Sequence, residues 1–183
     1  MELTLKSRAP RNAPSPRPAQ KPAPKPVLSP GDREILDAFD RARAKTIALL
    51  KIVPAKSLTR KADGEDVSIG ELFHHIAATV DGWMARCMQD RGPMPGAYEP
   101  SKPAISKALS ASRKRLLAYF KSEGGVKMDK VFMASRQGKT YRFVGRNRVS
   151  YLTQHEVHHR GKIILALRQW GVHEIPFMPF DND

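Results

Sequence analysis

The sequence predicts an all-α protein, a four-helix bundle preceded by a disordered, proline-rich basic tail. Three observations support this prediction: four stretches with apolar residues at helical spacing, glycines and prolines that separate them, and a change of composition near residue 30. At 183 residues the chain is long enough for one domain with a hydrophobic core. We therefore expect a tail of residues 1–30 and a single helical domain of residues 31–183.

The predicted tail differs in composition from the rest of the chain. It contains eight of the 15 prolines, and six lysines or arginines against one acidic residue, Glu2. Such a segment cannot bury enough apolar surface to offset the entropy lost on ordering, and its prolines favour an extended chain. Residues 31–183 contain 26 basic and 17 acidic residues, so they still carry +9 of the formal charge of +14.

The first two helices have recognisable starts. Asp32 is the predicted N-cap of the first helix, whose apolar residues recur at roughly helical spacing up to about Val53, where a proline follows. In the second helix, Ser68 and Glu71 match the S-x-x-E pattern of a capping box, and a wide apolar face continues to about Met88.

The third helix is predicted over residues 103–122, where two glycines stop it. Two short apolar segments follow, at residues 131–134 and 141–144, and they flank the turn sequence R-Q-G-K at 136–139. This arrangement predicts a short β-hairpin between the third and fourth helices.

The fourth helix, predicted over residues 148–170 with Gly171 at its C-terminal cap, contains the most informative motif of the chain. This motif is H-E-V-H-H-R-G-K at positions 155–162. On a helix, His155 and His159 lie one turn and about 40° apart, so both rings can reach one divalent cation.

A zinc-type site needs a third protein ligand, which must come from a neighbouring helix. On the second helix His75 lies about 60° beyond one edge of the apolar face and His74 about 80° beyond the other, so His75 is the better-placed ligand. The alternative for either histidine is a partly exposed residue with no ligand role. Glu71 could accept the second ring N–H of His75 or simply complete the capping box. Lys162 could hold an anionic substrate beside the metal or simply extend towards solvent.

Residues His155 to His159 also match H-E-x-x-H, the zinc metalloprotease pattern in which the glutamate, here Glu156, is the general base. The extended form of that pattern would need glycine and histidine where Lys162 and Leu165 stand. The sequence also shows no upstream sheet that could bind a peptide substrate. A zinc metalloprotease is therefore one functional hypothesis, ranked below the two that are described next.

The chain resembles the DinB/YfiT-like superfamily of metal-dependent four-helix-bundle enzymes over about residues 31–172. The residues that carry the resemblance are E-L-F-H-H-I at positions 71–76 and H-E-V-H-H-R-G at positions 155–161. Members often have glutamine where this chain has Lys162, and the proline-rich tail is an addition; neither difference removes a ligand.

The resemblance implies one divalent ion, commonly zinc or nickel, bound by three histidines with water completing the shell. Matched to this chain, the ligands are His75, His155 and His159. Relatives include thiol-dependent S-transferases and isomerases and suggested hydrolases. The leading hypothesis is therefore a metal-dependent transferase or hydrolase acting on a small molecule, with a low-molecular-weight thiol as candidate cosubstrate and a homodimer as a plausible assembly. No residue is assigned as catalytic, because Glu156 and His158 both point away from the ligand face.

The second hypothesis is a binding module for nucleic acid or an acidic partner, with a non-catalytic histidine cluster. Its basis is the charge of +14, since the sequence lacks zinc-finger spacing, an RNP signature and a basic region with heptads. Cys87 is the only cysteine, so no intrachain disulfide can form, and we expect it to be a small residue at the centre of the buried face of the second helix. No apolar run approaches membrane-spanning length, and a cytoplasmic protein is expected.

Overall fold

The computed structural model describes residues 27–88, 92 and 96–175. Within these residues the helices and strands are α1 (Pro30–Ile52), η1 (Ala55–Ser57), α2 (Ile69–Arg86), α3 (Lys102–Lys121), η2 (Ser122–Met128), β1 (Val131–Arg136), β2 (Lys139–Val144) and α4 (Gly145–Gln169). The predicted four-helix bundle with a hairpin between the third and fourth helices is confirmed. The predicted tail falls outside the described residues except for its last four positions.

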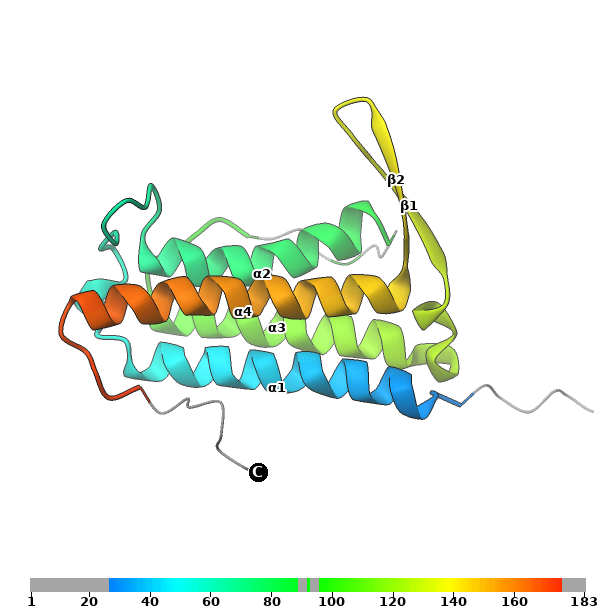
Figure 1. The fold of residues 1–183 in the computed structure, drawn as a ribbon, viewed down its shortest axis with the longest axis horizontal. Coiled ribbons are helices and arrows are strands. Elements are labelled where there is room, and N and C mark those ends of the chain that lie inside the picture. Colours follow the sequence, from blue (N-terminus) through cyan, green and yellow to red (C-terminus); the bar gives the residue numbers. More distant parts are fainter. Residues whose placement is uncertain (1–26, 89–91, 93–95, 176–183) are drawn as a thin grey trace, which may run out of the picture.

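The four long helices form a bundle in which α1 and α2 occupy opposite corners. Both α1 and α2 pack against α3 and α4, as the ribbon shows (Figure 1). The two strands pair as an antiparallel hairpin that projects sideways past α2, across the helix axes, at the end of the bundle where α4 begins (Figure 1). None of the described helices is both long and apolar enough to cross a membrane.

The start of α1 differs from the prediction. The N-cap is Ser29, whose hydroxyl oxygen accepts a hydrogen bond from the backbone N–H of Asp32 at 3.1 Å, so the assignment of Asp32 as N-cap is wrong. Pro30 takes the first helical position, where its fixed φ and missing N–H are tolerated. Leu28, which lies in the predicted tail, packs against the core.

The start of α2 confirms the predicted capping box. The backbone N–H of Glu71 donates to the hydroxyl oxygen of Ser68 at 3.3 Å, and the backbone N–H of Ser68 donates to a carboxylate oxygen of Glu71 at 2.6 Å. At the other end of the helix, Cys87 is half-buried at the C-cap. The expectation that it lies at the centre of the buried face is therefore wrong.

The hairpin leads directly into α4. Its two turn residues, Gln137 and Gly138, have φ of 51° and 72°, as a tight two-residue turn requires. The next helix begins at Gly145, three residues earlier than predicted. A Cβ atom at Gly145 would collide with the backbone carbonyl of Lys127, so glycine allows α4 to start against this segment.

A polar layer divides the buried core into two apolar clusters. One cluster joins the end of α1, the start of α2 and the end of α4, and the other joins the start of α1, the end of α2, the hairpin and the start of α4. Between them lie Arg43 and Glu156, which are 0% and 1% exposed. This layer lies at the level where α4 carries the predicted histidine ligands.

Candidate metal centre

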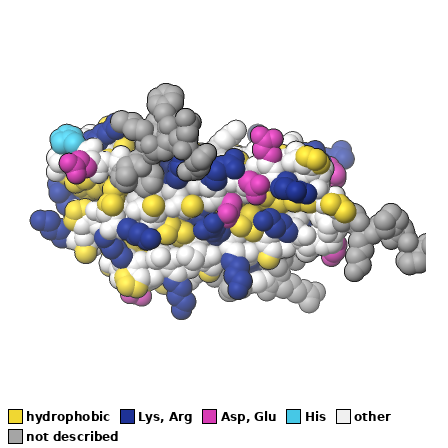
Figure 2. All heavy atoms as spheres, turned by 90° about the horizontal axis from the view of Figure 1, so that it is seen from below, with side chains coloured by type: hydrophobic (Ala, Val, Ile, Leu, Met, Phe, Trp, Pro, Cys, Tyr) yellow, Lys and Arg dark blue, Asp and Glu magenta, His cyan; other side chains and the backbone are white. Residues whose placement is uncertain are grey.

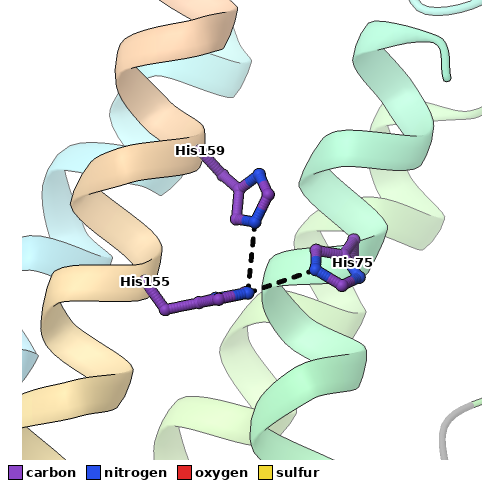
Figure 3. Close-up of side chains that lie close together, drawn as sticks. All are labelled: His75, His155 and His159. Carbon is purple, nitrogen blue, oxygen red and sulfur yellow. Dashed lines mark hydrogen bonds between the residues drawn. The ribbon is translucent and has the colours of Figure 1, made fainter. Parts of the chain in front are cut away.

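Three histidine rings from two helices converge on one point (Figure 3). The Nε2 atom of His155 lies 3.1 Å from Nε2 of His75 and 3.1 Å from Nε2 of His159. One ring nitrogen from each histidine lies within 4.8 Å of the others. The structure therefore brings together the three residues predicted as ligands, two from α4 and one from α2.

The arrangement fits a single metal ion. With a Zn–N distance of about 2.0–2.1 Å and tetrahedral angles, ligand nitrogens lie about 3.3 Å apart. The two separations of 3.1 Å that involve His155 are close to this value, and the nitrogens of His75 and His159 lie within 4.8 Å of each other. Three protein ligands in a tetrahedral shell leave one position for water or a substrate atom, as in catalytic zinc sites.

The environment keeps the rings uncharged at neutral pH. Burial, reinforced by the neighbouring histidines, lowers the pKa of His155 and of His159 to about 4. Burial also lowers the pKa of His75, with a smaller effect from His74. An imidazole must be unprotonated at the coordinating nitrogen, so the centre is poised to bind a cation without first losing protons.

The outer contacts of the rings are only partly those expected. The hydroxyl oxygen of Thr79 lies 3.4 Å from Nε2 of His75. Nδ1 of His159 is buried without a hydrogen-bond partner in the described part of the chain. Histidine ligands usually donate this second ring N–H to an acceptor, and His159 has none from the described residues.

Two accessory roles considered for the centre are not observed. The carboxylate of Glu71 accepts from the backbone of Ser68, and among the described residues no hydrogen bond joins Glu71 to His75. The ammonium of Lys162 forms an ion pair with Glu65 at 2.8 Å. Glu71 thus completes the cap of α2, and Lys162 contacts the loop before α2.

His74, the other histidine of α2, is not part of the cluster. A ring nitrogen of His74 donates to the backbone carbonyl of Gly96 at 3.0 Å, and the ring packs against Tyr98 with 5.7 Å between centroids. His158 is exposed, and its ring meets the ring of His159 edge-on at 5.0 Å. The preference for His75 over His74 as the third member of the cluster agrees with the structure.

Glu156 is bound in the core. Nε of Arg43 lies 2.9 Å from both carboxylate oxygens of Glu156, and Nη1 of Arg43 donates to the hydroxyl of Ser112 at 2.5 Å and to the carbonyl of Leu109 at 2.8 Å. A carboxylate held in this way on the inner side of α4 cannot take a proton from a metal-bound water. The protease hypothesis loses its general base.

This ion pair was missed in the sequence reading. The available signal was positional: Arg43 shares the buried face of α1 with Phe39, and Glu156 shares the buried face of α4 with Leu152 and Ile163. A charge inside an apolar face needs a buried partner, so the two faces together could have indicated a pair.

The basic character of the chain is spread out on the face seen in Figure 2. Lysine and arginine side chains lie there among apolar and acidic ones and do not gather into one continuous patch (Figure 2). Electrostatic attraction to polyanions needs only the net charge, whereas a dedicated nucleic-acid site concentrates its cations. This view offers no particular support for the binding-module hypothesis.

Comparison with known proteins gives a consistent family and fold. The family model of the DinB superfamily matches residues 38–163, more than half of the chain. A DinB-like protein from Bacillus cereus ATCC 10987 aligns with a TM-score of 0.66 and 15% identity, covering 80% of this chain and 96% of that one. The DinB-like protein YjoA from Bacillus subtilis aligns with a TM-score of 0.58 and 17% identity, covering 79% and 96%. No curated protein matches the chain. At identities of 15% and 17%, similarity to these solved structures establishes the fold alone.

Proposed function

The chain belongs to the DinB superfamily, and from this premise we propose that it is an enzyme dependent on one divalent metal ion held by His75, His155 and His159. The observation that carries the proposal is the convergence of three Nε2 atoms from two helices (Figure 3). Zinc and nickel are the expected ions, because imidazole nitrogen suits both.

A bound divalent ion would lower the pKa of a coordinated water towards about 7, or bind a substrate thiolate. The chain's own residues supply the conditions for this chemistry. Burial lowers the pKa of all three rings, to about 4 for His155 and His159, which favours the unprotonated form that binds a metal ion. Glu156 contributes no proton transfer, since Arg43 holds its carboxylate in the core.

The reaction class follows from the family resemblance. We propose transfer of a thiol to a small electrophilic substrate, with hydrolysis as the alternative reaction at the same centre. Both reactions use one coordination position beside three histidines. Thiol-transfer assays with low-molecular-weight thiols, run beside ester and amide hydrolysis assays, distinguish the two.

Metal analysis of the purified full chain tests the proposal. We expect about one equivalent of zinc or nickel in the wild type, and loss of this metal from His155→Ala and His159→Ala, because two nitrogens cannot replace a three-ligand site. His173→Ala is the matched control, since His173 is exposed after the end of α4. A wild type that takes up no divalent metal at neutral pH, or equal metal content in all four proteins, would contradict the proposal.

A further inference from the structure

A cavity of about 500 Å³ lies between α2 and the hairpin. Its walls include Thr79, Trp83 and Arg86 from α2, Cys87 at the C-cap of that helix, and Met133 from β1. This volume is within the range of small-molecule sites, about 300–1,000 Å³. The wall combines apolar surface with a small number of polar groups, which is the usual composition of a ligand pocket.

The cavity begins beside the histidine centre. Thr79 lines it, and the hydroxyl oxygen of the same residue lies 3.4 Å from Nε2 of His75. From Thr79 to Arg86 the helix rises about 10 Å at 1.5 Å per residue. A ligand that lies along α2 can therefore have one end near the metal centre and the other near Arg86.

The end of the cavity away from the histidines is positively charged. Arg86 lines it, and among the described residues Arg86 forms no ion pair with an acid and no acidic residue contributes to the wall. A second guanidinium, that of Arg148, stacks on the ring of Trp83 at 3.6 Å and on that of Phe143 at 4.1 Å. Nε of Arg148 is buried without a hydrogen-bond partner in the described part of the chain.

The guanidiniums of Arg86 and Arg148 both lie near Cys87, which lines the cavity. Burial raises the pKa of the Cys87 thiol, and the charges of Arg148 and Arg86 oppose that rise. Arg148 thus lies close to the cavity, held in place by aromatic rings and without a carboxylate that neutralises it within ion-pair distance in the described residues. The half-buried guanidinium of Arg148, with no acid partner among the described residues, favours an anion nearby, and the exposed guanidinium of Arg86 can contact that anion directly.

We propose that this cavity is the substrate pocket of the histidine centre and that it accepts a small organic anion. The apolar body of the ligand lies against Trp83 and Met133, its carboxylate or phosph(on)ate group meets Arg86, and its reactive end points towards His75. The assignment as substrate pocket rests on the proposed metal-dependent function, whereas the affinity for an organic anion is independent of it.

The single cysteine of the chain provides the test, because Cys87 lines the cavity. The rate of Cys87 alkylation by iodoacetamide is measured by intact mass on the full chain, with and without zinc. The probes are 4-phenylbutyrate and 4-phenylbutanol at equal millimolar concentrations, which differ only in the anionic group. We expect the carboxylate to slow alkylation and the alcohol to have little effect.

Two variants with the same change of charge locate the contact. Arg86→Gln should weaken protection by phenylbutyrate about tenfold, the loss expected for a charge-assisted hydrogen bond at a partly exposed site. Arg168→Gln should leave protection unchanged, because Arg168 is the corresponding basic residue in the last turn of α4 and does not line the cavity. Each variant is compared with and without probe, so its own effect on thiol reactivity cancels.

The outcomes separate this proposal from the proposed function. Three outcomes overturn the anion pocket: equal protection by acid and alcohol, no protection by either, or equal weakening in the two arginine variants. None of them changes the result of metal analysis on the same samples. Failure of the wild type to bind metal, with protection by phenylbutyrate intact, overturns the metal-dependent function and leaves the organic-anion site in place.

Discussion

Helix α4 carries two polar sites at the same level, and they face different parts of the molecule. On its inner side Glu156 is 1% exposed, and both of its oxygens lie within hydrogen-bond distance of Arg43. On the side towards α2, His155 and His159 are half-buried and meet His75. In the inner site two opposite charges pair, whereas in the outer site one ring nitrogen from each of three histidines lies close to the other two.

The two sites differ in how far their polar groups are already paired within the protein. A buried carboxylate whose two oxygens both accept from Nε of Arg43 has little capacity left for a ligand, and the pair helps to fix how α1, α3 and α4 are aligned. When the three ring nitrogens are unprotonated, hydrogen bonds among the rings cannot use all three lone pairs. One bound cation would accept all three. The same helix thus contributes a buried ion pair on one side and two members of the histidine cluster, the proposed metal site, on the other.

The largest expected effect comes from breaking the inner site, the pair of Arg43 and Glu156. Glu156→Gln should lower the free energy of unfolding by about 3–5 kcal/mol, because Arg43 then stays buried without its counter-charge. The double variant Arg43→Met, Glu156→Met should recover most of this loss, since well-packed apolar residues replace the pair at little cost. Urea unfolding of the metal-free proteins measures both. A double variant no more stable than Glu156→Gln would show that the pair itself is strongly stabilising.

The next effect concerns the outer site. Zinc at about 100 times its dissociation constant should raise the free energy of unfolding of the wild type by about 2.7 kcal/mol, because it binds the folded state alone. His75→Ala should lose this gain, and His173→Ala should keep it. Unfolding curves recorded with zinc and with a chelator give the difference; equal gains in all three proteins would place the metal elsewhere.

A third comparison uses the capping box, a polar contact between neighbours in sequence. Ser68→Ala should cost about 1 kcal/mol, because the backbone N–H of Glu71 loses its acceptor at the start of α2. Ser68→Thr, which keeps a hydroxyl, is the control and should cost less. Chemical denaturation measures the change, and a loss as large as that for Glu156→Gln would remove the contrast between local and long-range contacts.

The smallest effect comes from a partly exposed counterpart of the inner pair. Asp40 and Arg113 join α1 to α3 through two hydrogen bonds of 2.5 and 2.8 Å, with side chains 34% and 33% exposed. The hydrogen bond from Arg113 lowers the pKa of Asp40 in the folded state. Stability from this pair is therefore present above the ordinary pKa of aspartate and is lost as pH falls through the lowered value.

Asp40→Asn should accordingly cost less than about 1 kcal/mol at pH 7, because water screens a pair this exposed. The difference between wild type and variant should shrink as the pH is lowered below the ordinary range of aspartate. Thermal unfolding over a series of acidic pH values measures this. A difference that grows towards acid would contradict the assigned sign.

The sequence predicted contacts between near neighbours better than those between distant ones. The capping box of Ser68 and Glu71 and the pairing of His155 with His159 follow from helical spacing, and both are confirmed. His75 could be chosen because the apolar face of its helix fixes which way each position points. Arg43 and Glu156 are 113 residues apart, and their contact depends on how α1 and α4 pack, which no local spacing encodes.

The start and end of elements were predicted less well for a related reason. Ser29 was overlooked as N-cap because Asp32 also has a capping side chain, and the choice depends on where Pro30 can enter the helix. The early start of α4 depends on the close approach of Gly145 to the backbone of Lys127, a tertiary contact. The cavity between α2 and β1 likewise exists only once the hairpin has taken its place beside the bundle.

The direct passage from β2 into α4 at Val144 and Gly145 has a mechanical consequence. With no connecting loop to absorb a displacement, a tilt of the strands is passed on to the first turn of the helix that bears His155. A molecule in the cavity that displaces Met133 would therefore also displace the start of α4, the helix that carries His155 and His159.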